Sequence, residues 1–464
     1  MREYVLKLAP FQTLDVLSCH VRKQLNDHAR FEFSGLIRAE DEEKYLNTGM
    51  EEIQVKLLLE CEGEPDYLLC CGIAQDIRIQ KVGDLRKLTV QAVSGSYLMD
   101  LVRNVRVFQN SGSTYDAVLK HNEKSYQDGG HSMIAGAGAT IGNLLVQYHE
   151  TDWEFAKRLA SHFNDVVVPA YRTDGVNYSF GLPDGRQNIG LSKSAYTIRK
   201  DAAGYLEKTK NQGAPLIEAD ALCLEVDSRD VYEIGDSFPF RGQTFYIYDI
   251  ESSLDGQELV HHYKLKSKAA LQTIKQYNER MIGASLEANI VGVSKDTVQV
   301  SIAADGIQDG KKWFLYSTVY SSPDGTGWYC MPEVGDSVRL YLPNEKEKDG
   351  YIISAVHLEA TGEARSTPDN KSLKSKYGKE VLFTPSLLRL TNNNGMSVEI
   401  SDEDGIIISS DKGVTIEAKE GLQIASLEQS IEVVAPESIV MEQGETKLTL
   451  KDDIHLDGAQ VHME

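Results

Sequence analysis

An apolar pattern with a step of about eight residues runs through the last 67 residues of the chain and constrains its fold more than any other feature. Gly405, Gly413 and Gly421 keep the same step, each placed just before an apolar pair. Residues two apart on a strand point to one face, and glycine permits the positive φ of a tight corner. The first four pairs are Val398/Ile400, Ile406/Ile408, Val414/Ile416 and Leu422/Ile424.

Five further pairs follow between Ile431 and Met463, with a step that drifts between six and nine residues. Strand, corner and strand at a fixed pitch indicate a β-solenoid. Each repeat supplies only two inward side chains, too few to fill the inside of a coil made by one chain. The pattern therefore predicts a trimeric, intertwined β-helix over residues 381–464, a needle whose core three copies share. The alternative is a stack of short hairpins, which we expect to keep a less regular step.

The net charge of the chain is −22, and half of it falls in the predicted needle. Residues 381–464 hold 16 Asp and Glu against 5 Lys and Arg, a net charge of −11. Acidic residues at outward positions, such as Glu399, Glu417, Glu432 and Glu442, solvate the needle and oppose its aggregation. So acidic a chain is not expected to bind nucleic acid, since binding to phosphate requires a basic surface.

The rest of the 464 residues are expected to form about two further domains. Residues 1–283 contain β-rich runs, among them 55–59, 67–71, 87–93, 221–226 and 243–250, with a helical insertion at about 100–163. A second all-β unit covers 284–358, and a polar linker covers 359–380. The N-terminus lacks the apolar run of a secretory signal, which favours synthesis and assembly in the cytoplasm without a signal peptide. The six cysteines are expected to be reduced and mostly buried.

Two separate motifs resemble those of one protein family. Residues 147–160 read QYHETDWEFAKRLA and resemble the "Q-Y-x-E-[ST]-D-x-x-F-x-x-R-L" segment of VgrG-like spike proteins of contractile injection systems, a family that includes type VI secretion spikes and phage tail hubs. Residues 327–338 read GWYCMPEVGDSV and are similar to the family's "G-W-x-x-x-P-E-V-G-D-x-V". Residues 350–356 resemble its closing strand, with Gly350 and Ser354 in place of the usual proline and glycine.

The resemblance implies a mainly β fold: a hub of two β-barrels with the helical insertion, an OB-fold barrel over 284–358, and the needle. The motif residues then have structural roles. Thr151 and Glu154 form a capping box, and Trp153, Phe155 and Leu159 pack the helix that follows. Pro332, Gly335 and Asp336 form a turn before a strand. The other matched positions are Gln147, Tyr148, Glu150, Asp152, Trp328 and Glu333.

The same resemblance implies a non-enzymatic, trimeric spike and hub at the tip of a contractile injection machine. Its partners would be a hexameric, Hcp-like tube protein, baseplate proteins, and a PAAR-type tip cap with effectors, and the needle would pierce a target membrane mechanically. The machine would deliver the protein outside the cell or into a target cell. The sequence does not distinguish a phage tail, a tailocin, an extracellular injection system and a type VI apparatus.

No catalytic constellation appears in the sequence, and no cofactor is expected. Gly136-Ala137-Gly138 lacks the third glycine of a dinucleotide loop, and His261-His262 points to opposite faces of a strand, so both are expected to be structural. The one candidate for a metal is the needle apex, where His462 and Glu464 from three copies would give octahedral N and O ligands. Against it, Val461 and Met463 on the inward face would turn His462 outward.

A different class of function also fits the sequence. An extracellular protein could use the OB-fold to bind glycan and the solenoid as a stalk. Trp313, Tyr316, Tyr320 and Trp328 would then supply the binding surface.

Overall fold

The computed structural model describes residues 5–47, 54–60, 65–191, 195–211, 213–256, 258–307, 311–356, 366–450 and 454–457, with the backbone alone for 211 and 454–457. The fold is mainly β, as the sequence predicts. The chain divides into two compact units, 1–358 and 359–464. Each unit is described by itself.

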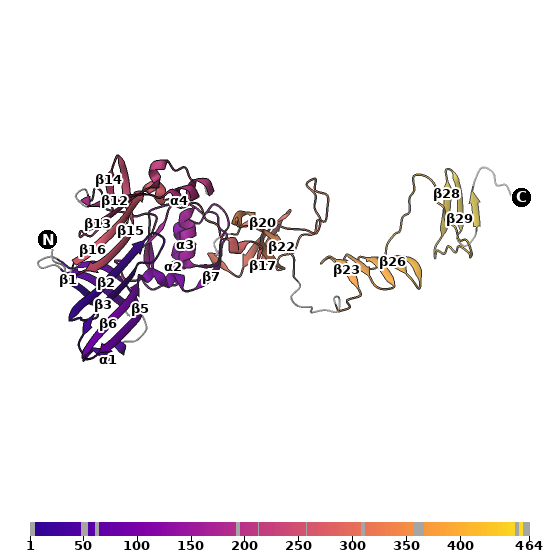
Figure 1. The fold of residues 1–464 in the computed structure, drawn as a ribbon. Helices are drawn as coiled ribbons and strands as arrows, with labels where there is room; N and C mark the ends of the chain where they lie inside the picture. Colours follow the sequence, from indigo (N-terminus) through magenta and orange to yellow (C-terminus); the bar gives the residue numbers. More distant parts are fainter. Residues whose placement is uncertain are drawn as a thin grey trace. The chain divides into compact units, whose positions relative to one another are not determined.

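One eleven-stranded sheet dominates the first unit (Figure 1). Its centre is the antiparallel pair β2–β15, in which Gln24 lies opposite Asp249 and His20 opposite Ser253. Two parts of the chain more than 200 residues apart therefore form one surface, on which the largest apolar core packs. The strands in order are β1 Val5–Ala9, β4 Gln54–Glu60, β5 Tyr67–Val82, β6 Leu85–Val93, β3 Arg30–Ile37, β2 Asp15–Gln24, β15 Gln243–Asp255, β16 Glu258–Ser267, β13 Leu222–Ser228 and β12 Tyr196–Lys200, with β14 Ser237–Phe240 on β15.

The β-rich runs predicted for this region fall on strands of the sheet, β4, β5, β6, β13 and β15, apart from Ala221, which precedes β13. Alternate residues of β4 are buried, as expected for a strand with one face on a core. Three short helices lie between strands of this sheet in the sequence or follow its last strand: α1 Asp41–Leu46, α4 Ala202–Leu206 and α5 Lys268–Leu271.

The prediction of a helical insertion at about 100–163 is only partly right. Two helices lie there, α2 Tyr115–Glu123 and α3 Asp152–Ser161, but β7 Arg103–Phe108, β8 Gly130–Met133 and β9 Leu145–Thr151 lie there too. β7 and β9 pair antiparallel, and β8 joins β11 Asn177–Phe180 and β10 Val167–Pro169. Helices therefore cover only part of the segment, because β7 and β9 pair with each other as strands.

A five-stranded sheet follows, in the order β20 Trp313–Leu315, β18 Thr297–Ile302, β17 Ala284–Ser294, β21 Ser337–Leu342 and β22 Tyr351–Ile353. This sheet contacts the segment 100–163 through strand pairing, a shared apolar core and a side-chain hydrogen bond. β19 Asp305–Ile307 pairs parallel with β7, and Val107, Leu144 and Val146 of the insertion belong to the core of the five-stranded sheet. The Gln109 side chain donates a hydrogen bond of 3.1 Å to the carbonyl oxygen of Val300.

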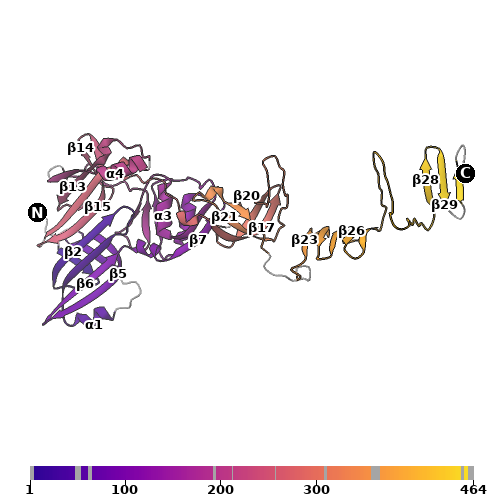
Figure 2. The ribbon, with the colours of Figure 1, turned by 45° about the vertical axis from the view of Figure 1, so that its right-hand side comes forward.

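The second unit contains two antiparallel sheets (Figures 1 and 2). The first has the order β23 Lys371–Lys374, β24 Glu380–Phe383, β25 Leu387–Thr391, β26 Met396–Ser401 and β27 Gly405–Ser410. The second has the order β28 Ile439–Gln443, β29 Thr446–Leu450 and β30 Ile454–Asp457. No strand lies between 411 and 438.

Two expectations for this unit need correction. Strands β26 and β27 form a hairpin in which the apolar pairs Val398/Ile400 and Ile406/Ile408 keep the eight-residue step, which we expected hairpins to break. Gly405 has a φ of +76°, as a tight corner requires, but Gly413 and Gly421 lie outside strands and have no positive φ. Within one chain, the apolar pairs that follow these two glycines have no neighbouring strand to pair with.

No helix in the described part of the chain is long and apolar enough to cross a membrane. Five of the six cysteines are described, and all five are free thiols. Cys330 is exposed and the other four are buried. Cys61 lies outside the described residues.

Candidate functional site

The first sequence motif spans the end of β9 and the start of α3. Thr151 is the N-cap of α3 and forms the predicted capping box: its hydroxyl accepts from the Glu154 amide at 3.0 Å, and the Glu154 carboxylate accepts from the Thr151 amide at 3.0 Å. Trp153, Phe155 and Leu159 are buried in one apolar cluster. The Trp153 indole also donates a long bond of 3.4 Å to the Asn26 carbonyl, beside the large sheet.

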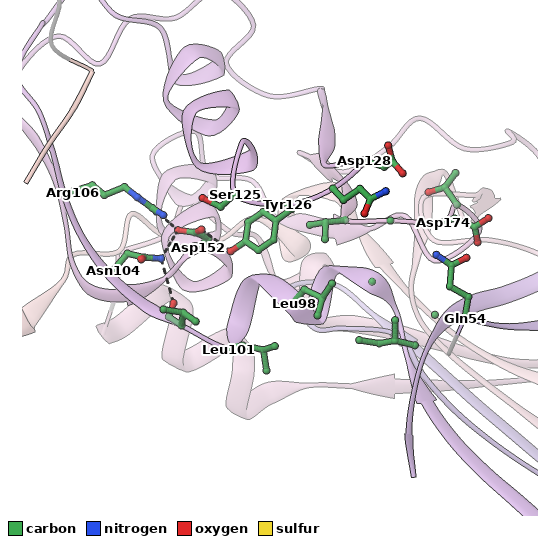
Figure 3. A pocket seen from close by; sticks show the side chains of 18 residues that line it. Gln54, Leu98, Leu101, Asn104, Arg106, Ser125, Tyr126, Asp128, Asp152 and Asp174 are labelled. Carbon is green, nitrogen blue, oxygen red and sulfur yellow. Dashed lines mark hydrogen bonds and ion pairs between the residues drawn. The ribbon is translucent and has the colours of Figure 1, made fainter. Parts of the chain in front are cut away.

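Asp152 is the centre of a buried polar network (Figure 3). Its side chain has no exposed surface. Gln147 donates to Oδ1 of Asp152 at 2.7 Å, and the Tyr126 hydroxyl donates to Oδ2 at 2.7 Å. The other donors, all to Oδ1, are Arg106, Asn104 and Asn122. A buried carboxylate needs such partners, because an unpaired charge would be costly to desolvate.

A second buried network joins the motif to the five-stranded sheet. Arg158 of α3 forms a two-pronged pair with Glu150, with both N–O distances at 2.8 Å, and its Nη1 donates to Glu347 at 2.7 Å. Its Nη2 also donates to the Val146 carbonyl at 2.7 Å. Burial alone would lower the pKa of Arg158, but Glu150 and Glu347 hold it above the ordinary value. Arg158 thus stays charged and ties β9 to the short helix η6 Glu347–Asp349.

One cluster has the residue types of a hydrolase triad. His28 bonds Ser96 through Nδ1 at 2.9 Å and Asp100 through Nε2 at 3.3 Å. Ser96 and His28 are buried, and the Ser96 hydroxyl already bonds that of Ser94 at 2.9 Å. Asp100 also accepts from the Thr151 hydroxyl at 2.5 Å. A nucleophile must reach its substrate, so this cluster supports the helix cap and is unsuited to catalysis.

The second motif forms the predicted turn. Gly335 has a φ of +99°, and the Asp336 carboxylate accepts from the Glu333 amide at 2.8 Å. Pro332 is buried, whereas Trp328 is exposed. Tyr148 of the first motif is half-buried, and its carbonyl accepts from Asn278 at 2.8 Å.

The other residues singled out in the sequence also have structural environments. His261 is buried and bonds Ser252 at 2.6 Å, while its neighbour His262 pairs with Asp227 at 2.7 Å. A Cβ on Gly136 would lie 2.4 Å from the ring of Phe163, so the glycine allows this ring to pack closely on the backbone. Burial raises the pKa of Cys19 and Cys70 to about 12, which keeps both thiols protonated and unreactive.

A groove of about 450 Å³ lies beside the Asp152 network (Figure 3). Arg106, Asn104, Tyr126 and Asp152 line one end, and Gln54, Asp128 and Asp174 appear on the opposite side of the view. Apolar side chains also line the groove, among them Ile73, Leu98, Leu101 and Val102.

His462 and Glu464 lie outside the described residues, so the apical metal site stays a prediction. Among the residues that are described, no group of three or more His, Cys, Asp or Glu side chains is placed to hold a metal ion. Of the aromatic residues considered for glycan binding, Trp313, Tyr320 and Trp328 are exposed and Tyr316 is half-buried.

Sequence reasoning missed the partners of the motif. Arg106, Asn122, Tyr126 and Glu347 come from other elements, and no local pattern marks them as partners of Asp152 or Arg158. The sequence did contain one indication of buried ion pairs. Acidic and basic residues alternate with apolar ones in QYHETDWEFAKRLA, so some of the charges are expected to be buried, and buried charges require partners.

No family model matches the sequence, and no curated protein matches it. Solved structures do match the fold. The Escherichia coli c3393 protein, described as a component of the type VI secretion system with structural similarity to the T4 bacteriophage tail proteins gp27 and gp5, is 13% identical and superposes with a TM-score of 0.52. The match covers 76% of this chain and 100% of that one.

Chains from structures of the Francisella PdpA-VgrG complex match over more of the sequence. The lidded form gives a TM-score of 0.59 at 10% identity, over 88% of this chain and 80% of that one. The lidless form gives 0.57 at 10% identity, over 88% and 98%. The fold of this chain is therefore similar to that of a type VI secretion component and to that of chains in the PdpA-VgrG complex.

Proposed function

We propose that this protein is the non-enzymatic hub and spike of a contractile injection machine, and that it acts as a homotrimer. The fold supports a structural part of a secretion or tail assembly. The main observation in favour of a trimer is the apolar face of the sheet β23–β27.

Strand register places two apolar rows side by side on one face of this sheet. Val398 lies opposite Leu390 on one side and Ile408 on the other, and Ile400 lies opposite Leu388 and Ile406. Continued across the sheet, the first row is Leu373, Val381, Leu390, Val398 and Ile408, and the second is Phe383, Leu388, Ile400 and Ile406.

Most of these side chains are exposed in a single chain: the exposed fractions are 71% for Ile406 and 60% for Ile408. The opposite face carries the ion pair Arg389–Glu399, with an N–O distance of 2.9 Å. A sheet with one apolar and one polar face must bury the apolar face, and so large an exposed apolar surface marks an interface. Three copies meeting around an axis would bury all three apolar faces in one core.

The same reasoning extends to residues 411–438. Val414, Ile416, Leu422 and Ile424 are all more than half exposed and lie in no strand. Strands from neighbouring copies would supply both the missing hydrogen bonds and the apolar contacts. We therefore propose that the intertwined β-helix predicted over 381–464 includes this segment, with Glu417 and Glu432 facing solvent.

The buried contacts between the insertion and the five-stranded sheet suit a protein that transmits force. The five-stranded sheet shares a core with the insertion, and the Arg158 network is buried at the same junction. We propose that the hub binds a hexameric tube protein and baseplate proteins, and that the needle carries a tip cap and effectors and pierces the target membrane. In this role the machine would carry the protein out of the cell.

The test is the mass of the full-length protein in solution by light scattering. We expect three times the chain mass of 51.6 kDa. A monomer at micromolar concentration would contradict the proposal, and a monomer that also binds oligosaccharide would favour the glycan-binding alternative.

A further inference from the structure

We propose that Asn394 is a site of spontaneous covalent modification, at which the side-chain amide is lost, aspartate and isoaspartate form, and the isoaspartate weakens the turn between β25 and β26. This inference goes beyond the proposed function and does not depend on the trimer. It follows from the sequence of the turn, the hydrogen bonds of its three asparagines and the free amide nitrogen of Gly395.

The turn between β25 and β26 contains three consecutive asparagines, and only the last has a free side chain. The side-chain oxygen of Asn392 accepts from the backbone amides of Asn394 at 2.8 Å and of Met396 at 3.0 Å. The side-chain nitrogen of Asn393 donates to the carboxylate of Glu380 at 2.8 Å. Asn394 is exposed, and within the described part of the chain it forms hydrogen bonds only through its backbone.

The backbone nitrogen of Gly395 is the second reacting group. Gly395 has no side chain to shield this nitrogen, and its φ of +86° is one that residues with a Cβ rarely adopt. Its carbonyl oxygen accepts from the Asp411 amide at 3.1 Å, but its own N–H donates to no group among the described residues. Asn394–Gly395 is also the only Asn-Gly pair in the sequence. The two reacting groups are therefore adjacent, and neither is engaged elsewhere in the described structure.

Asparagine is among the thermolabile residues, and the reaction here needs only water as a co-reactant. The deprotonated amide nitrogen of Gly395 attacks Cγ of Asn394 and closes a succinimide ring, and Nδ2 leaves as ammonia after it takes up the displaced proton. Water then opens the ring. Cleavage of the bond between Cγ and the ring nitrogen gives aspartate, whereas cleavage at the backbone carbonyl carbon gives isoaspartate, in which the main chain runs through Cβ and Cγ.

The isoaspartate product changes the geometry of the turn. It adds a methylene group to the main chain, so the side chain of Asn392 cannot keep its bonds to both the amide and the carbonyl of residue 394. The turn joins β25 and β26, in which Leu390 lies opposite Val398. Because the turn sets the register of a hairpin, the longer main chain should weaken the pairing of these two strands.

The test incubates the full-length protein at pH 8 and at pH 6 and follows it by peptide mapping with mass spectrometry, in which fragment ions assign the site. We expect Asn394 to gain the mass of an amide-to-acid exchange and to give both products, faster at pH 8 because the nucleophile is the deprotonated nitrogen. Asn370 is the internal control, since it is also exposed but precedes Lys371, and it should stay intact. Retention of Asn394 for as long as Asn370, or conversion only after unfolding in urea, would overturn the proposal.

A variant separates the effect of Asn394 from ageing elsewhere in the chain. Asn394→Gln keeps an amide at this position, but its longer side chain closes a larger ring less readily, so it should stay intact under the same conditions. Asp-Gly pairs such as Asp404–Gly405 isomerise without a change in mass, and they do so equally in both proteins. The midpoint of thermal unfolding should therefore fall further on incubation in the wild type than in Asn394→Gln. Equal losses would overturn the weakening of the turn.

Discussion

Arg158 in α3 donates a hydrogen bond of 2.7 Å to Glu347, a residue 189 positions further along the chain. The bond crosses from the first sequence motif to the region of the five-stranded sheet, and both side chains are buried. The motif that made the sequence recognisable is therefore the joint between two parts of the first unit.

We predict that Arg158→Ala destabilises this joint severely. Removing the guanidinium leaves Glu150 and Glu347 buried without a counter-charge, which costs about 3–5 kcal/mol. Thermal unfolding followed by circular dichroism should show an early transition, and limited proteolysis should cut near residue 283 at lower protease concentration. The control is Arg78→Ala, which removes an exposed pair with Asp76 and should leave both measurements unchanged. A wild-type profile for Arg158→Ala would show that the joint does not depend on this pair.

We predict that Ile406→Asp prevents assembly of the needle. The substitution places a charge in the middle of the proposed shared core, where no partner is available. Light scattering should show loss of the trimer. Ile407→Asp is the matched control, since Ile407 lies one residue away on the opposite face of the sheet, and it should leave the mass unchanged. The same loss in both variants would argue against one-sided packing.

We predict that His261 makes the first unit less stable in mild acid. Burial lowers the pKa of His261 to about 4, with a further contribution from Lys23, and its ordinary value is 6.5. Between pH 6.5 and about 4, the imidazole of His261 is protonated in the unfolded chain but neutral in the folded chain. The stability present above pH 6.5 is therefore lost as the pH falls toward 4, by roughly 2 kcal/mol between pH 7 and 5.

Urea denaturation at pH 7 and pH 5 checks this. His261→Gln should lose less stability between the two pH values than the wild type does. His262→Gln, at the neighbouring half-exposed position, should follow the wild type. An identical pH dependence in all three proteins would assign the acid sensitivity to other groups.

The apical metal site can be tested directly. If three copies each supply His462 and Glu464, the purified trimer should hold about one divalent ion, and His462→Ala should release it. Metal analysis of the two proteins, prepared without chelator, gives the answer. A stoichiometry near zero in the wild type would mean that His462 faces solvent, as the inward positions of Val461 and Met463 suggest.

The sequence by itself determined the mainly β fold, five strands of the large sheet, the helix that begins after Thr151, and the turn at Gly335. Each of these depends on local chemistry: alternation of apolar residues, a capping box, or a backbone with positive φ. Such signals act over a few residues, and the sequence shows them in full.

Tertiary structure decided the rest. Residues 100–163 contain strands as well as helices because β7 and β9 pair with each other, and Asp152 and Arg158 have partners from elements far along the chain. The C-terminal repeat shows the same division. The sequence marked its apolar pairs, but only strand register showed that Val398, Leu390 and Ile408 form one row. Pairing between distant segments decides which side chains share a face, and no local pattern contains that information.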